Sequence, residues 1–156
     1  MDPVGQERVA ASDPFDLNRF VEAQEATYEQ ALAEIREGRK RSHWMWFIFP
    51  QFAGLGFSPT SQRYAIRSVA EAEAYLRHPI LGRRLVECAE AVLAVEGKSA
   101  TEIFGHPDDL KLRSSATLFA SVASPGSVFH RILEKYFQGA ADPQTLRLID
   151  DAGGGK

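Results

Sequence analysis

Helix-start signals recur along this chain, and they constrain its fold more than any other feature of the sequence. In each, a Ser or Asp suited to an N-cap is followed by Pro at the next position or by Glu three positions on: Asp13-Pro14, Ser58-Pro59, Ser68 with Glu71, Ser99 with Glu102, and Asp142-Pro143. The cap side chain satisfies backbone N–H groups of the first turn. A proline at the first helical position loses no hydrogen bond. Apolar residues between these signals recur at steps of three and four, which indicates amphipathic helices.

These signals divide the chain into nine expected helices, several of them short. They cover residues 14–37, 43–49, 59–66, 69–77, 79–96, 100–104, 107–123, 125–137 and 143–149. The continuous apolar run over 43–49 also fits a buried strand, but Ser42 before it, Pro50 after it and the lack of a second strand-like run favour a helix. The sequence contains no alternating apolar run, no Asn-Gly or Asp-Gly hairpin and no repeat of fixed period. We therefore expect an all-α protein, a compact orthogonal array of about seven to nine helices.

Length and charge restrict the domain organisation and the class of partner. At 156 residues the chain has the usual size of one domain. We expect a flexible arm over residues 1–12, a single helical domain over residues 13–150 and a flexible tail over residues 151–156. A net charge of −3 makes nucleic acid an unlikely partner. No apolar run is long enough to cross a membrane, and no secretory signal is present, so we expect a cytoplasmic protein.

Cysteine and histidine usage argues against a metal site. The single cysteine, Cys88, excludes an internal disulfide and any zinc site built from several cysteines. It occupies an apolar position of a helical pattern, which favours buried packing over reactivity. The four histidines share no spacing typical of metal ligands. We expect no metal, and the sequence indicates no cofactor.

Residues 39–51 form the most unusual segment of the chain. They run from three consecutive cations, through the only two tryptophans, into a continuous apolar stretch that reaches Pro50. Arg39, Arg41 and Ser42 are candidate ligand-binding residues, because positive charge and a hydroxyl at a helix start can bind phosphate or carboxylate. The alternative is a solvated basic turn after a helix C-terminus, where cations are favoured.

The same segment supplies candidates for ring stacking and proton transfer. Trp44 and Trp46 can stack on a planar ring beside the cations, although an aromatic run of this kind more often packs in a core. His43 is the candidate catalytic acid or base, because imidazole titrates near neutral pH. The alternative is a structural histidine that binds a backbone carbonyl. Gln51 is a candidate for orienting a ligand.

A second unusual stretch, residues 108–117, carries two cations and three hydroxyls on one predicted helix. Lys111, Arg113, Ser114 and Ser115 are the candidate ligand-binding residues here. They can form the second wall of an anion pocket, or they can simply be a solvated helix face. Neither serine lies in a nucleophile-elbow motif, so a catalytic serine is not indicated.

The segment His43-Trp44-Met45-Trp46-Phe47-Ile48-Phe49-Pro50-Gln51 resembles a bacterial and fungal family known as domain of unknown function 1810, sometimes labelled calpastatin-like. Further segments fit the same family: Asp13-Pro14-Phe15-Asp16-Leu17 with Arg19-Phe20, Gly54-Leu55-Gly56, His78-Pro79 with Leu81-Gly82, and Lys111-Leu112-Arg113-Ser114-Ser115 with Thr117-Leu118-Phe119. Ala116 stands where the family usually has Met. The resemblance covers most of residues 13–149 and implies an all-α fold. It implies no reaction and no catalytic residues. The calpastatin label does not suit a chain with the composition of a folded domain.

Two functional hypotheses follow from the two unusual stretches. The first is a domain that binds a small anionic, partly aromatic ligand, such as a nucleotide or an ADP-ribose-like compound, in a cleft between residues 39–46 and residues 111–115. It requires the two stretches to lie side by side, and it leaves open whether the protein is an enzyme. The alternative is a non-enzymatic protein-interaction module with an exposed apolar patch.

Overall fold

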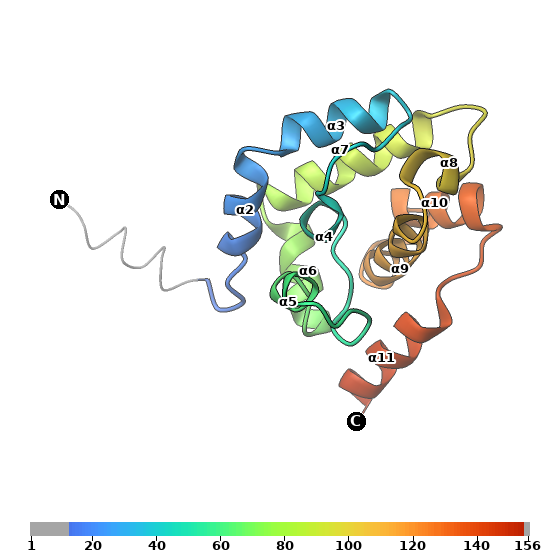
Figure 1. The fold of residues 1–156 in the computed structure, drawn as a ribbon. Helices are drawn as coiled ribbons and strands as arrows, with labels where there is room; N and C mark the ends of the chain where they lie inside the picture. The colour runs from blue at the N-terminus through green and yellow to red at the C-terminus, as the bar shows by residue number, and fades with distance from the viewer. Residues whose placement is uncertain (1–12, 155–156) are drawn as a thin grey trace.

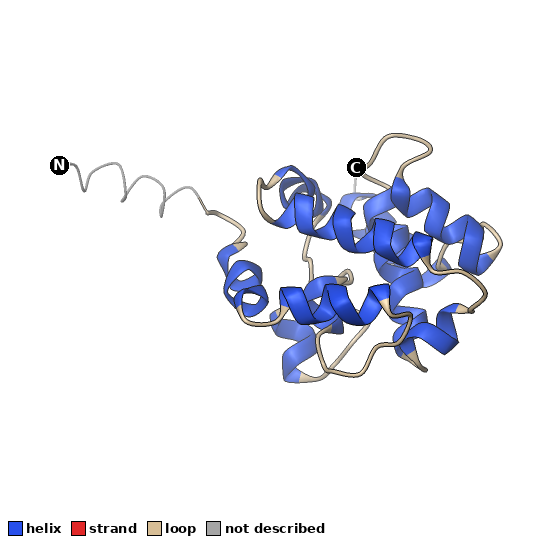
Figure 2. Cartoon of the chain, turned by 90° about the horizontal axis from the view of Figure 1, so that it is seen from above, coloured by secondary structure: helices blue, strands red, loops and turns tan. Residues whose placement is uncertain are grey.

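The computed structural model describes residues 13–154, and this part of the chain folds into ten helices around one core (Figure 1). The helices are α2 (Asn18–Glu25), α3 (Tyr28–Arg36), α4 (Met45–Ile48), α5 (Pro59–Arg63), α6 (Val69–Arg77), α7 (Leu81–Ala94), α8 (Ala100–Phe104), α9 (Asp108–Ala120), α10 (Val128–Phe137) and α11 (Pro143–Gly154). Apart from a single parallel bridge between Phe52 and Ile66, the described residues contain no β-structure (Figure 2). The predicted all-α fold is confirmed. The predicted arm over residues 1–12 lies outside the described residues.

Most helix ends form where local chemistry predicts them. Ser58 and Ser68 each accept a hydrogen bond from the backbone N–H three residues later, at 3.1 and 3.0 Å. Ser99 and Glu102 form a complete capping box at the start of α8. Gly38 follows the end of α3 with a φ of +77°, a conformation that suits glycine.

The first predicted helix is wrong in one respect, because it consists of two helices, α2 and α3, separated at Ala26 and Thr27. The break lets the two halves bury different faces: α2 contacts α4, whereas α3 packs along α7. It also lets the buried Gln24 donate to the Phe47 carbonyl at 2.7 Å. Asp13 does not cap a helix that starts at Pro14. Its carboxylate accepts from the N–H of Leu17, one turn further on.

Other helix boundaries also differ from the prediction, by one to five residues. Helix α5 ends at Arg63 rather than Ile66, α7 begins at Leu81 rather than Pro79, and α10 begins at Val128 with Ser127 as its cap. The imidazole Nδ1 of His78 accepts from the N–H groups of Ile80 and Leu81, so it caps the turn that leads into α7. Helix α11 continues to Gly154, so residues 151–154 of the predicted tail are helical.

The core is held together by α7, α9 and α10, and a chain of aromatic side chains crosses it. Tyr75 of α6 lies 5.0 Å from Phe20 and 5.4 Å from Phe119, measured between ring centroids, and Phe119 lies 5.7 Å from Phe129. These four rings come from four helices, so their contacts join α2, α6, α9 and α10. Cys88 is fully buried, as predicted, and burial raises the pKa of its thiol to about 12.

A buried arginine ties the N-terminal part of the chain to α6. The Arg19 guanidinium donates to the Glu71 carboxylate at 2.8 Å and to four backbone carbonyls, those of Phe15, Asp16, Arg63 and Ala65. Both members of the ion pair are almost completely buried. Because the remaining donors are satisfied by carbonyls, the charge is stabilised without water, and the segment before α6 is held in place.

Candidate functional site

The basic segment after α3 is organised by one buried carboxylate, Glu34. It is 2% exposed, although glutamate is almost never fully buried without partners. Its two oxygens accept hydrogen bonds from five donors: the N–H groups of Arg41 and Ser42, the Ser42 hydroxyl, the Trp44 indole and the Gln30 amide. The segment that carries the predicted anion site therefore wraps around an anion that belongs to the protein.

The environment of Glu34 keeps it ionised. Burial on its own raises the pKa of a carboxyl group, but the hydrogen bonds from Ser42, the Arg41 N–H, Trp44 and Gln30 outweigh burial and lower the pKa of Glu34 from 4.5 to about 2. Hydrogen bonds to a charged acceptor are stronger than those to a neutral one. The ionised Glu34 carboxylate therefore holds the segment after α3 in place.

This network gives several predicted site residues structural roles. The Trp44 indole donates to Glu34 at 2.8 Å and is completely buried, so it has no free face for a ligand ring. Ser42 does not cap α4, because its hydroxyl donates to Glu34. Arg41 forms an exposed ion pair with Glu37 at 2.6 Å. Arg39 and His43 are exposed and line none of the clefts described below.

The two unusual stretches nevertheless lie side by side. Lys40 forms a salt bridge of 2.9 Å with Asp108, the first residue of α9, and Lys111 lies 3.4 Å from the other oxygen of the same carboxylate. The ammonium of Lys111 lies 5.3 Å from the centre of the Trp46 ring. The binding hypothesis required the two stretches to lie side by side, and they do, through contacts of Lys40, Trp46, Asp108 and Lys111. Of these four residues, only Trp46 and Lys111 were predicted as site residues.

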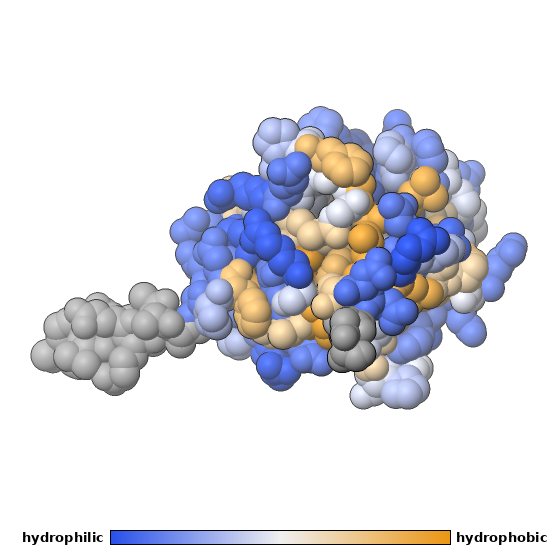
Figure 3. All heavy atoms as spheres, turned by 90° about the horizontal axis from the view of Figure 1, so that it is seen from below, coloured by the Kyte–Doolittle hydropathy of each residue, from blue (hydrophilic) through white to orange (hydrophobic). Residues whose placement is uncertain are grey.

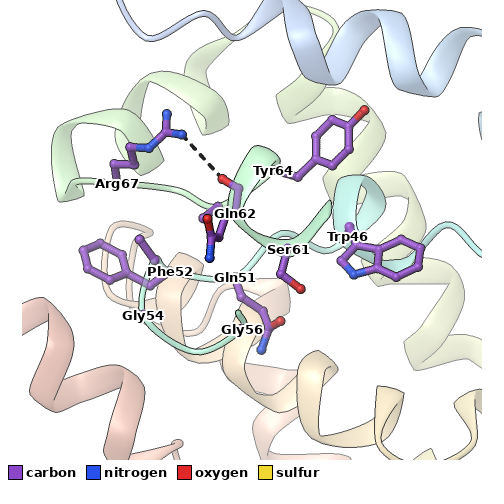
Figure 4. A pocket seen from close by; sticks show the side chains of 11 residues that line it. Trp46, Gln51, Phe52, Gly54, Gly56, Ser61, Gln62, Tyr64 and Arg67 are labelled. Atoms are coloured by element: carbon purple, nitrogen blue, oxygen red, sulfur yellow. Dashed lines mark hydrogen bonds between the residues drawn. The ribbon is translucent and has the colours of Figure 1, made fainter. Parts of the chain in front are cut away.

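A cleft opens beside Trp46 and Lys111, and it has two adjoining compartments that share Gln51, Gly56 and Ser61. The first has a volume of about 220 Å³ and is lined by aromatic and polar side chains from α4 and from the chain between α4 and α6, including Trp46, Phe52, Tyr64 and Arg67. The second, of about 410 Å³, lies between the Leu55–Gly56 loop, α9 and the start of α11. Figure 4 shows the indole of Trp46, the hydroxyl of Ser61 and the amide of Gln51 around the first compartment.

Four predicted residues besides Trp46 line this cleft: Gln51, Lys111, Arg113 and Ser114. Ser115, by contrast, is fully buried inside α9. Arg113 donates to the carbonyls of Ala140 and Ala141 at 2.8 and 2.9 Å, so it ties the linker before α11 to α9. The side-chain amide of Gln51 has no hydrogen-bond partner among the described residues, and it faces both compartments.

Several lining residues were not foreseen from the sequence. Ser61 and Tyr64 lie in the helix predicted from Ser58-Pro59 and Arg67 lies just after it, but no residue pattern marked them as site residues. Asp142 was expected to cap the last helix, and it does, because its Oδ2 accepts from the Thr145 N–H at 3.1 Å. That this carboxylate also lines the cleft had no signal in the sequence.

Exposed apolar side chains occur on segments around the cleft. Phe57 is 81% exposed, Leu110 48% and Leu146 46%. They belong to the loop before α5, to α9 and to α11, and Leu110 itself lines the larger compartment. Figure 3 views the molecule from below, relative to Figure 1. On this face, apolar residues gather near the centre, with hydrophilic residues around them.

Within residues 13–154, no three His, Cys, Asp or Glu side chains are grouped in a way that suits a metal ion. None of the helices in this range combines the length and the apolar character needed to span a membrane.

Comparison with known proteins gives a family and a close structural relative. No curated protein matches the sequence. The crystal structure of the conserved hypothetical protein Rv1873 from Mycobacterium tuberculosis superposes with a TM-score of 0.86 at 54% sequence identity, over 88% of this chain and 98% of that one. The family model described as "Protein of unknown function (DUF1810)" matches residues 14–149. The chain therefore belongs to the DUF1810 family.

Proposed function

We propose that the two-compartment cleft binds a small ligand that combines an anionic group with a planar ring, such as a nucleotide or an ADP-ribose-like compound. The observation that carries this proposal is the position of the Lys111 ammonium, 5.3 Å from the centre of the Trp46 ring, where both residues line the cleft. A cation and an indole side by side are the two groups that such a ligand requires.

The state of each group supports this use. Trp46 is only partly buried, unlike Trp44, so part of its indole is available to a ligand. The contact between Lys111 and Asp108 is 3.4 Å long, whereas Asp108 holds Lys40 at 2.9 Å. Asp108 is therefore engaged mainly by Lys40. A ligand phosphate at normal hydrogen-bond distance from Lys111 competes with a weak partner.

The size and polarity of the cleft also suit a ligand of this class. The larger compartment, at about 410 Å³, falls within the usual range for small-molecule sites, and the smaller one extends it toward Trp46 and Tyr64. The uncommitted Gln51 amide lies where the compartments meet and can donate to one ligand atom while accepting from another. The proposal covers binding alone, because His43 lies outside the cleft.

A binding screen tests the proposal directly. The purified protein is heated with AMP, ADP-ribose, NAD and sugar phosphates in turn, alongside Lys111→Met and Trp46→Ala variants. A ligand at a hundred times its dissociation constant raises the free energy of unfolding by about 2.7 kcal/mol. For a chain of this size, that corresponds to roughly 5–10 °C in melting temperature.

The matched control is Arg39→Ala, which removes a cation from the same basic run but outside the cleft. We expect the ligand-induced shift to persist in Arg39→Ala and to disappear in Lys111→Met. A shift that is lost in the Arg39 variant and kept in the Lys111 variant contradicts the proposed site. The absence of a shift with every compound contradicts the proposed function.

The exposed side chains of Phe57, Leu110 and Leu146 favour a second candidate, a protein-interaction surface around the cleft. Exposed apolar residues that form a contiguous patch mark interaction sites. A Phe57→Ser variant separates the two candidates, because it weakens binding of a partner protein while leaving ligand-induced stabilisation unchanged. Co-sedimentation of the native protein and of the variant with proteins from the same cell extract measures the binding of a partner.

A further inference from the structure

The cleft contains a fixed carboxylate that an anion site alone does not explain. Asp142 lines the larger compartment together with Lys111 and Ser114. A carboxylate in a site for phosphate repels the ligand unless it contacts another part of the molecule. Its presence therefore indicates what kind of group the ligand carries beside its anion.

The structure holds Asp142 in one orientation. Its backbone N–H donates to the Thr117 hydroxyl at 2.9 Å, and its Oδ2 accepts from the Thr145 N–H at 3.1 Å and from the Thr145 hydroxyl. The hydroxyl of Ser114 lies 3.2 Å from the same oxygen. Arg113 fixes the two preceding carbonyls. A group held in this way loses little conformational freedom when it binds a ligand.

Only one of the two carboxylate oxygens is used by these contacts. Capping of α11 requires a single acceptor, and Oδ2 provides it. Oδ1 accepts no hydrogen bond from any described residue of the protein. A carboxylate oxygen that is ionised and uncommitted is a strong acceptor for the hydroxyl groups of a sugar.

The presence of both charges in one compartment suits a sugar phosphate. Lys111 and Ser114 lie one turn apart on the same face of α9, with a rise of about 5 Å between them. Ser114 forms a hydrogen bond with Asp142, and Lys111 lines the same compartment, so one ligand can reach both the cation and the carboxylate. A pentose 5-phosphate likewise carries its phosphate and its vicinal hydroxyls on opposite sides of one ring.

We propose that Asp142 recognises the sugar hydroxyls of the ligand, so that the cleft selects ribosyl phosphates over their deoxy counterparts. This assignment rests on the proposed function and adds a specificity-determining residue to it. In this arrangement the base lies toward Trp46, the phosphate lies at Lys111, and the ribose hydroxyls donate to Oδ1 of Asp142.

Calorimetric titration with AMP and with 2′,3′-dideoxy-AMP tests the assignment in the native protein and in Asp142→Asn. Asparagine keeps an N-cap oxygen but removes the charge, and Asp142→Ser serves as a second capping variant if the first does not fold. We expect the native protein to bind AMP at least tenfold more tightly than the dideoxy compound. We expect that ratio to fall to about one in the variants, a change that a purely structural role does not produce.

The outcomes separate this assignment from the proposed function. Tight AMP binding that needs Lys111 but shows no preference for the hydroxyls overturns the role of Asp142 and leaves the cleft as a binding site. If Asp142→Asn still prefers AMP over 2′,3′-dideoxy-AMP as strongly as the native protein does, the role of Asp142 is likewise overturned. If neither AMP nor any compound of the wider screen binds, the proposed function fails and the assignment fails with it.

Discussion

The indole nitrogen of Trp44 donates a hydrogen bond of 2.8 Å to the carboxylate of Glu34. This contact determines which of the two tryptophans is available to a ligand. Trp44 lies in the core, where its indole binds Glu34. Trp46 lies two residues later on the short helix α4 and lines the cleft instead. The most conspicuous segment of the sequence thus divides into a structural half and a half that faces the cleft.

We predict that Glu34→Gln destabilises the protein by about 3 kcal/mol, or roughly 6–12 °C in melting temperature. The amide keeps one acceptor but turns an NH₂ group toward donors that are bound by the carboxylate in the native protein. Chemical denaturation of both proteins measures the change. Glu37→Gln is the matched control, because Glu37 is exposed and its loss leaves the unfolding midpoint nearly unchanged. Equal midpoints for the two variants contradict the structural role of Glu34.

The contribution of Glu34 to the free energy of unfolding depends on pH, because the pKa of its carboxyl group is lowered in the folded protein. In the folded protein the pKa is about 2, whereas an unperturbed glutamate has 4.5. A group with a lowered folded-state pKa stabilises the protein fully above its unfolded value, and this contribution is lost as the pH falls through the folded value. We therefore expect the stability difference between the native protein and Glu34→Gln to be constant above pH 5 and to shrink between about pH 4.5 and pH 2. Urea titrations across this range test it, and a constant difference contradicts it.

The helical fold was predictable because helix ends are determined largely by local chemistry. Ser99 and Glu102, for example, cap α8 with side chains three residues apart in the sequence. The break between α2 and α3 was not predictable in this way. It depends on Gln24 reaching a carbonyl 23 residues away, and no Gly or Pro marks the position.

The site was predictable only in part, for a related reason. Trp46, Gln51 and Lys111 were identified because unusual residue types stand out in a sequence. Arg41 and Trp44 looked equally suitable, and what distinguishes them is the buried Glu34, which in the sequence resembles any other glutamate of an amphipathic helix. Tertiary contacts therefore decide which residues of a conspicuous segment face the cleft.

Gly82 provides a test of the close packing between α6 and α7. A Cβ atom added at this position would lie 2.0 Å from the carbonyl oxygen of Leu76, a backbone atom that cannot rotate away. Alanine usually stabilises a helix by up to about 1 kcal/mol relative to glycine. Here we predict the opposite sign, a loss of about 2 kcal/mol or more, because the helices must separate.

Gly97→Ala is the control for Gly82→Ala. Nothing lies within 4 Å of a Cβ at Gly97, but its φ of +75° is unfavourable for alanine. We expect this variant to lose only about 1–2 kcal/mol, from backbone strain alone. Thermal unfolding of both variants measures the difference. A Gly82→Ala protein as stable as the native one shows that the two helices can move apart without cost.

The different environments of the two tryptophans are directly measurable, because the chain contains no others. Trp44 is completely buried, whereas Trp46 is partly exposed at the cleft. We predict that acrylamide quenches the fluorescence of Trp44→Phe, which retains Trp46, several times more efficiently than that of Trp46→Phe. Circular dichroism confirms the fold of each variant, since Trp44→Phe loses the hydrogen bond to Glu34 and about 1–2 kcal/mol with it. A ligand in the cleft should protect Trp46 from the quencher and leave Trp44 unaffected. Equal quenching of the two variants means that Trp46 is not accessible from the cleft, and it contradicts the proposed stacking of a ligand ring on Trp46.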